Sequence, residues 1–212
     1  MLIKRKVVFP LLIISLIFFL VISALSAVAL TKGEILSKLG LIERSRINSS
    51  TQAEPSEADV VVKANNFVIT NTELSITGSE LELSGYNPEK AKDKAVKIVI
   101  EKKALYHAAT VAGYTVSDEY VQKQIDENRK AVESSYNRDD YETFLQGLGM
   151  TSEEYWDSQF ETLKIYGTIS NHKEALKNEY LDAGEPADGW DTYYDNYKKS
   201  VIKEEDITII KH

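Results

Sequence analysis

Ala112-Gly113-Tyr114-Thr115-Val116-Ser117-Asp118-Glu119-Tyr120-Val121 is the stretch that decides the fold of this chain. Gly113 can adopt the left-handed conformation that ends a helix. Ser117 can cap the next helix, and Asp118 and Glu119 then lie in its first turn, where negative charge suits the helix dipole. The stretch therefore predicts that one helix stops and another begins here.

A similar junction follows about thirty residues later, at Gly149-Met150-Thr151-Ser152-Glu153-Glu154-Tyr155. Thr151 and Glu154 have the spacing of a capping box. Two such junctions in series predict an array of helices.

Composition limits the class of protein. The chain has 212 residues, enough for one domain with extensions or for two small domains. The formal net charge is −8, and setting aside Lys4, Arg5 and Lys6 leaves −11 for the remainder. Such an acidic body argues against binding of nucleic acid. Cysteine is absent, which excludes disulfides, thiolate chemistry and sulfur-based metal sites.

The N-terminus predicts export to the membrane. Residues 1–6 are basic and precede an apolar run over residues 7–30 that contains no charge. Roughly 20 apolar residues span a bilayer, and the preceding basic residues favour a cytoplasmic N-terminus with the C-terminal part outside. We therefore predict a single-pass signal-anchor in the cell membrane. The alternative is a signal peptide cleaved near Ala29, after Ala27-Val28-Ala29, which would release a secreted protein.

Residues 31–58 are predicted to be a juxtamembrane linker. The segment from Glu43 to Glu57 is rich in Ser, Glu and Arg, contains Pro55 and shows no apolar period, which is typical of a flexible stalk. The residues from Thr31 to Ile42 either extend the anchor helix or lie at the membrane interface.

Residues 59–212 are predicted to form one folded, mainly α domain. Val60–Ala64 and Phe67–Ile69 form a small β hairpin around the turn residues Asn65 and Asn66. The expected helices are Thr70 to Leu83 behind a capping box with Glu73, Asn87 to Gly113, Ser117 to Ser134, Tyr141 to Leu148, Thr151 to Leu181 and Trp190 to Val201, with a break at Ala183–Pro186 and a final strand at Ile207–Ile210.

The strand count predicts how the chain closes. An isolated hairpin is marginally stable in water. The other convincing strand is Ile207–Ile210, at the far end of the chain. We therefore expect this C-terminal strand to pair with the hairpin.

Several phrases together resemble a known family. Lys63–Thr70 with Glu73 is similar to the family's opening V-N-G-x-x-I-T strand, with Asn66 in place of its glycine. Ala112–Val121 matches its G-x-x-V-S-D-E-x-V phrase, and Trp190 to Ile209 is similar to its last helix and closing strand. A looser F-x-x-x-L-x-x-x-G-x-T-x-E-x-Y match is carried by Phe144, Gly149, Thr151, Glu153 and Tyr155.

The family is the N-terminal chaperone domain of SurA- and PrsA-type extracytoplasmic foldases. The resemblance implies a helical domain with a small hairpin closed by a C-terminal strand. It also implies binding of unfolded or exported polypeptide clients without cofactor or catalysis.

Many relatives insert a parvulin prolyl-isomerase domain, and this chain departs from that pattern. Only about twenty residues separate Tyr180 from Ser200, too few for such a domain. The histidines, His107, His172 and His212, are interpreted as structural or solvated. Prolyl isomerase activity is therefore disfavoured, although the family label could carry it.

Other catalytic or metal chemistry has no support in the sequence. There is no G-x-S-x-G, H-E-x-x-H or phosphate-binding glycine loop. The pairs Asp139-Asp140 and Glu153-Glu154 lie at expected helix N-termini, where capping explains them. Asp182, Glu185 and Asp188 lack the regular spacing of a calcium loop. We predict no catalytic residues, no cofactor and no metal.

Aromatic residues supply the candidate binding site. Trp156 and Phe160 are predicted to pack in the core. Tyr136, Tyr141, Tyr193 and Tyr194 are the candidates for a partly exposed, polypeptide-binding groove. The function predicted is that of a membrane-anchored, chaperone-like holdase or foldase. The alternative is a structural or regulatory interaction protein that uses the same fold for a single partner.

Overall fold

The structure is a computed structural model that describes residues 31–50, 56–134 and 138–210. The predicted basic segment 1–6 and signal-anchor 7–30, together with Tyr136 and His212, lie outside the described residues. Within the part of the chain that is described, no helix is long and apolar enough to cross a membrane.

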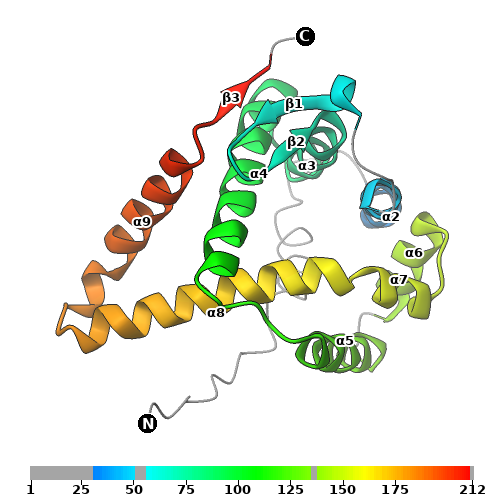
Figure 1. Cartoon of the computed structure of the whole chain (residues 1–212). Helices are drawn as coiled ribbons and strands as arrows, with labels where there is room; N and C mark the ends of the chain where they lie inside the picture. Colours follow the sequence, from blue (N-terminus) through cyan, green and yellow to red (C-terminus); the bar gives the residue numbers. More distant parts are fainter. Residues whose placement is uncertain (1–30, 51–55, 135–137, 211–212) are drawn as a thin grey trace.

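The fold is mainly helical, with a small antiparallel sheet, as predicted (Figure 1). The elements, in chain order, are α2 (Lys32–Ser50), η2 (Glu57–Asp59), β1 (Val60–Lys63), β2 (Val68–Thr70), α3 (Asn71–Leu83), α4 (Pro88–Val111), α5 (Asp118–Glu133), α6 (Arg138–Leu148), α7 (Ser152–Ser158), α8 (Phe160–Asp182), η3 (Ala187–Gly189), α9 (Trp190–Glu204) and β3 (Thr208–Ile209).

The sheet closes the chain on itself. Its strand order is β2-β1-β3, and Val62 of β1 pairs with Ile209 of β3. Val62 and Ile69 are buried with Val99 of α4, and Ile207 packs against this cluster. The predicted pairing of the C-terminal strand with the hairpin is therefore confirmed.

The hairpin turn is tied to the end of α9. The backbone N–H of Asn65 donates to the Glu205 carbonyl at 2.8 Å. Glu205 is 3 % exposed, and its carboxylate accepts from the backbone and side chain of Asn66 at 3.2 and 3.1 Å. His107 Nδ1 of α4 contacts the other carboxylate oxygen at 2.9 Å. One buried carboxylate thus joins the hairpin, α4 and the exit from α9.

The junctions that were predicted from glycines and caps are confirmed. Gly113 and Gly149 have φ of 80° and 72°. The Ser117 side chain accepts from the backbone of Tyr120 at the start of α5. Complete capping boxes are present at Thr70 with Glu73 and at Thr151 with Glu154. Local chemistry therefore sets where these helices begin and end.

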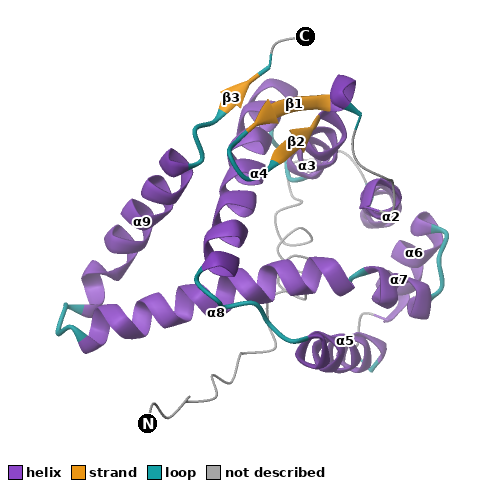
Figure 2. Ribbon diagram, viewed as in Figure 1, coloured by secondary structure: helices purple, strands orange, loops and turns teal. Residues whose placement is uncertain are grey.

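The long helices α4, α8 and α9 run along the sides of a triangle in the view of Figures 1 and 2. Helix α4 packs against both α8 and α9, whereas α5, α6 and α7 lie at the far end of α8. A core of Val121, Ile125 and Trp156 joins α5 to α7. Phe160 packs against it, so the predicted core positions of Trp156 and Phe160 are confirmed.

The flexible stalk predicted from Glu43 to Glu57 is wrong for the described residues up to Ser50. These residues belong to α2, which packs mainly against α6 and α3. Ile35, Leu36 and Ile47 of α2 are buried. The folded part therefore begins by Lys32 rather than at residue 59, and residues 31–50 do not act as a linker.

Two glycines bring α2 and α6 into close contact. A Cβ added to Gly40 would lie 2.5 Å from the backbone nitrogen of Leu148. A Cβ added to Gly147 would lie 2.6 Å from the Ser37 carbonyl oxygen. The two backbones thus touch, and Lys32 adds an ion pair to Asp140 at 2.5 Å.

The single helix predicted from Thr151 to Leu181 is also wrong, because it breaks at Gln159 into α7 and α8. No glycine or proline marks the break. Gln159 is 5 % exposed, and its side chain donates to Glu43 of α2 at 2.9 Å. A contact distant in sequence thus holds the residue at which the helix ends.

Candidate functional site

A row of aromatic rings runs between α8 and α9 and reaches the surface where the two helices meet. We call this set the aromatic row. Its ring centroids lie 4.7–6.1 Å apart, the spacing of stacked or edge-on rings. Its members, in order along the row, are Tyr114, His172, Tyr197, Tyr194, Trp190, Tyr193 and Tyr180.

The spacing of residues along α9 places its rings. Trp190, Tyr194, Tyr197 and Val201 recur at helical intervals and lie on one face. Trp190 and Val201 are buried, and Tyr194 and Tyr197 are partly buried. Tyr193 lies beside this face and is 40 % exposed. The row is therefore anchored in the interior and open at its outer end.

The turn between α8 and α9 positions the outer rings. Gly184 ends α8 with φ of 85°, and the Tyr180 hydroxyl donates to the Pro186 carbonyl at 3.1 Å. A side chain at Gly189 would collide with the Tyr180 hydroxyl, so this glycine admits the ring. The Tyr180 and Tyr193 rings then lie 4.9 Å apart, with Trp190 behind both.

An open pocket of about 440 Å³ lies at this outer end. It is lined by Glu179, Tyr180, Ala183, Glu185 and Tyr193. Its lining residues thus include two tyrosines and two glutamates. Rings with polar edges suit contact with extended polypeptide, because they bury area at little cost in side-chain entropy.

The surroundings of the pocket are acidic. Residues 178–197 contain Glu179, Asp182, Glu185, Asp188, Asp191 and Asp195 and no lysine or arginine. Burial raises the pKa of Tyr180, and Glu185 and Asp188 raise it further. The pKa of Tyr197 rises to about 12, through burial and the neighbouring Tyr194 and Glu204. These phenols are therefore neutral at physiological pH and act as hydrogen-bonding rings.

His172 is a packing residue within the row. It is 8 % exposed, stacks on Tyr114 at 4.7 Å and meets Tyr197 edge-on at 5.7 Å. Burial lowers its pKa below the ordinary value, with a small opposing effect from Glu179. The neutral imidazole therefore serves as another ring, in agreement with its interpretation as structural.

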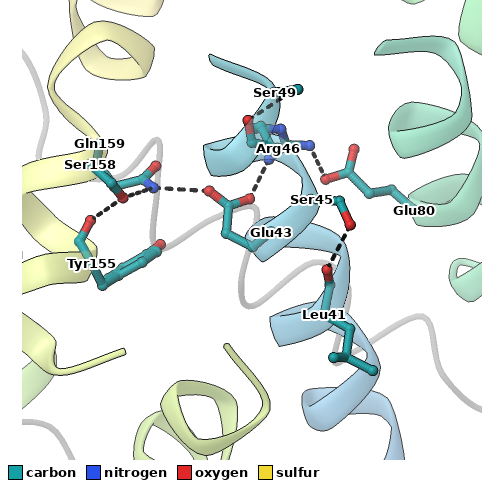
Figure 3. Close-up of polar contacts among 9 residues, drawn as sticks. All are labelled: Leu41, Glu43, Ser45, Arg46, Ser49, Glu80, Tyr155, Ser158 and Gln159. Carbon is teal, nitrogen blue, oxygen red and sulfur yellow. Dashed lines mark hydrogen bonds and ion pairs between the residues drawn. The ribbon is translucent and has the colours of Figure 1, made fainter. Parts of the chain in front are cut away.

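A polar cluster connects α2 to the elements on either side of it (Figure 3). Glu43 is 8 % exposed and accepts from Gln159 at 2.9 Å and from Arg46 at 2.6 Å. Arg46 also forms an ion pair with Glu80 of α3. Burial alone would lower the pKa of Arg46, but Glu80 and Glu43 raise it above its usual value. These charges satisfy one another, so the cluster fastens α2 to α3 and to the α7–α8 junction.

The four predicted binding tyrosines have different outcomes. Tyr193 and Tyr194 lie in the aromatic row. Tyr141 is 5 % exposed in the core of α6, and its hydroxyl contacts Ser152 at 2.9 Å, so its prediction as a groove residue is wrong. Its ring packs inward with Phe144 and Leu148 because all three share the apolar face of α6. Tyr136 lies outside the described residues.

Other members of the pocket were missed by sequence reasoning. Glu179, Tyr180 and Glu185 line it, and Tyr180 comes from a different helix than Tyr193. Trp190 contacts the Tyr180 ring in the aromatic row. The i, i+4 spacing of Trp190 and Tyr194 was the available signal. The turn between α8 and α9 brings Tyr180 next to the rings of Trp190 and Tyr193. No local spacing in the sequence indicates this contact.

Both carboxylate pairs, Asp139-Asp140 and Glu153-Glu154, lie in the first turn of a helix, as predicted. Glu154 caps α7, and its hydrogen bond with the Thr151 backbone lowers its pKa. Asp139 and Asp140 lie in the first turn of α6. Across residues 31–50, 56–134 and 138–210 there is no cluster of three or more metal-ligating side chains.

Comparisons with protein-family models, with curated proteins and with solved structures find no match to this chain. The α8–α9 junction, with its aromatic row and acidic pocket, is therefore the candidate functional site.

Proposed function

We propose that this chain is a non-catalytic, chaperone-like protein that binds unfolded or newly exported polypeptides. The observation that carries the proposal is the aromatic row, which is fixed in the interior and open at Tyr180 and Tyr193. A rigid aromatic surface can contact many sequences, because ring faces accept apolar side chains of different shapes. Such binding requires neither nucleotide nor metal.

The arrangement of the elements supports the proposal at the level of the fold. The resemblance to SurA- and PrsA-type chaperone domains implies a hairpin, a helical arm and a closing strand, in that order. Here β1 and β2 open the arrangement, α3 to α9 follow, and β3 completes the sheet. Membership of that family remains a proposal.

We also propose that the body is held close to a membrane. The apolar run 7–30 ends two residues before α2 begins at Lys32, and α2 is packed into the body. An anchor in that run would leave little slack between bilayer and body. Cleavage near Ala29 is the alternative, and mass spectrometry of the mature N-terminus distinguishes the two.

An aggregation assay tests the proposed function. The full chain in lipid nanodiscs is mixed with several unrelated unfolded proteins, and empty nanodiscs serve as the blank. We expect delayed aggregation of more than one client. Tyr193→Ser should weaken the delay, whereas Tyr86→Ser should not, because Tyr86 is similarly exposed at 38 % but lies outside the row.

Failure to delay aggregation of any client would overturn the general chaperone proposal. Copurification of one partner in that case would favour the alternative of a dedicated structural or regulatory interaction protein.

A further inference from the structure

The pocket at the outer end of the aromatic row has a composition that selects for charge. Its volume of about 440 Å³ is at the small end of the range for ligand sites, roughly 300–1,000 Å³. Tyr180 and Tyr193 line one hollow together with Glu179 and Glu185. An aromatic face carries negative electrostatic potential, so both kinds of wall favour a cation.

The charge around the pocket also favours binding of a cation. The nearest basic residues along the chain are Lys177 and Lys198, on either side of the acidic segment 178–197. Lys198 is already occupied, with ion pairs to Asp195 at 3.0 Å and to Glu101 at 3.4 Å. Neither Lys177 nor Lys198 lines the pocket. Glu179 and Glu185 are exposed, and no lysine or arginine lines the pocket beside them.

The neighbouring rings show that cations pack on tyrosine in this molecule. Lys173 Nζ lies 4.7 Å from the centroid of the Tyr194 ring, and Lys198 Nζ lies 5.6 Å from it. These distances fall within the roughly 6 Å over which a cation is attracted to a ring face. Tyr194 is thus already covered by lysines of this chain, whereas no lysine or arginine lines the hollow at Tyr180 and Tyr193.

We propose that this pocket binds a cationic side chain of the client polypeptide, with arginine preferred over lysine. The inference rests on the proposed function and specifies its substrate class: apolar segments that carry a basic residue. Arginine is preferred because its planar guanidinium stacks on aromatic rings and pairs with carboxylates at the same time. Lysine offers a compact, strongly hydrated charge and gains less from the rings.

A peptide series tests the preference. Four fluorescent peptides share one unstructured, apolar sequence and differ in a central arginine, lysine, citrulline or glutamate. Citrulline is the key comparison, because it keeps the shape of arginine and removes the charge. Binding to the full chain in nanodiscs is followed by fluorescence anisotropy. We expect arginine to bind about tenfold more tightly than citrulline, with lysine between them and glutamate weakest.

Two double variants locate the effect. Glu179→Gln with Glu185→Gln should reduce the arginine-to-citrulline ratio severalfold, leaving the part that the rings supply, while binding of the citrulline peptide is unchanged. Glu82→Gln with Glu161→Gln removes the same net charge from exposed positions on α3 and at the opposite end of α8. This control should keep the ratio. Melting curves of both variants establish that the fold is intact.

The outcomes separate this inference from the function on which it rests. Equal binding of arginine and citrulline peptides by the unmodified protein would overturn the cationic preference and leave polypeptide binding standing. An equal loss in both double variants would assign the preference to overall charge and also overturn the pocket. No binding of any peptide would overturn the proposed function itself.

Discussion

Gly147 lets α2 and α6 approach until their backbones touch. A methyl group at this position would lie 2.6 Å from the Ser37 carbonyl oxygen, and backbone cannot move aside as a flexible side chain can. Gly147→Ala should therefore lower the free energy of unfolding by roughly 1–3 kcal/mol, the usual cost of overpacking. Thermal melting followed by circular dichroism measures the change.

Gly78 provides the matched control, because it also lies within a helix but has no atom within 4 Å of an added Cβ. Gly78→Ala should leave stability unchanged or raise it by up to about 1 kcal/mol, since alanine is the better helix former. Equal melting temperatures for the two variants would contradict the close approach of α2 and α6.

His172 gives the fold a predictable response to acid. Burial holds the pKa of the folded state below its ordinary value of about 6.5, so the unfolded chain binds the proton first. The stabilising contribution is complete above pH 6.5 and is lost as the pH falls through the folded-state pKa.

His172→Phe keeps a ring between Tyr114 and Tyr197 and removes this titration. The loss of stability between pH 7.5 and 5 should be smaller in the variant than in the unmodified protein. Urea unfolding at several pH values measures both. Parallel pH profiles would show that His172 does not titrate as its burial implies.

At the scale of elements, α2 is the helix that completes the α6 core. Ile47 of α2 is buried with Tyr141, Phe144 and Leu148 of α6. A chain that begins at Asp59 loses this contact and the Glu43–Gln159 hydrogen bond. It should melt roughly 10 °C or more below a chain that begins at Thr31, because several kcal/mol of burial are lost.

The comparison of these two chains by calorimetry decides whether α2 is part of the fold. If the chains that begin at Asp59 and at Thr31 had the same melting curve, residues 31–50 would contribute nothing to stability and would be a linker.

The elements that sequence predicted well are those with local causes. Gly113, Ser117 and the capping box at Thr70 act through their own backbone conformation or through residues three positions away. The packing of α2 into the folded body escaped prediction because the polar residues of Glu43 to Glu57 suggested a solvated stalk. Glu43 instead accepts a hydrogen bond from Gln159, and Arg46 forms an ion pair with Glu80. Both partners are distant in sequence, so no local pattern predicts these contacts.

The site was predicted in part for the same reason. Tyr193 and Tyr194 share a helix with Trp190, and their clustering was visible along the chain. The partner ring of Tyr180 comes from α8 and reaches them only through the turn at Gly184 and Gly189. Tyr141 was misplaced although its apolar helix face, shared with Phe144 and Leu148, indicated burial.

At the scale of the whole molecule, the hairpin and the closing strand hold the two ends of the segment from β1 to β3 together. The Glu205 carboxylate joins Asn66 to His107, and β3 completes the sheet. With its ends fixed, the chain between them forms a framework in which α4 packs against both α8 and α9. This framework keeps the outer end of the aromatic row open to solvent at Tyr193.

Site-specific photocrosslinking tests the central claim most directly. A photoreactive phenylalanine replaces either Tyr193 or Leu41 in the full chain, and unfolded clients are then added and irradiated. Leu41 is the control because it is 55 % exposed on α2, away from the aromatic row. Client binding at the α8–α9 junction predicts strong crosslinks from position 193 and few from position 41. Equal crosslinking from both positions, or none from position 193, would contradict it.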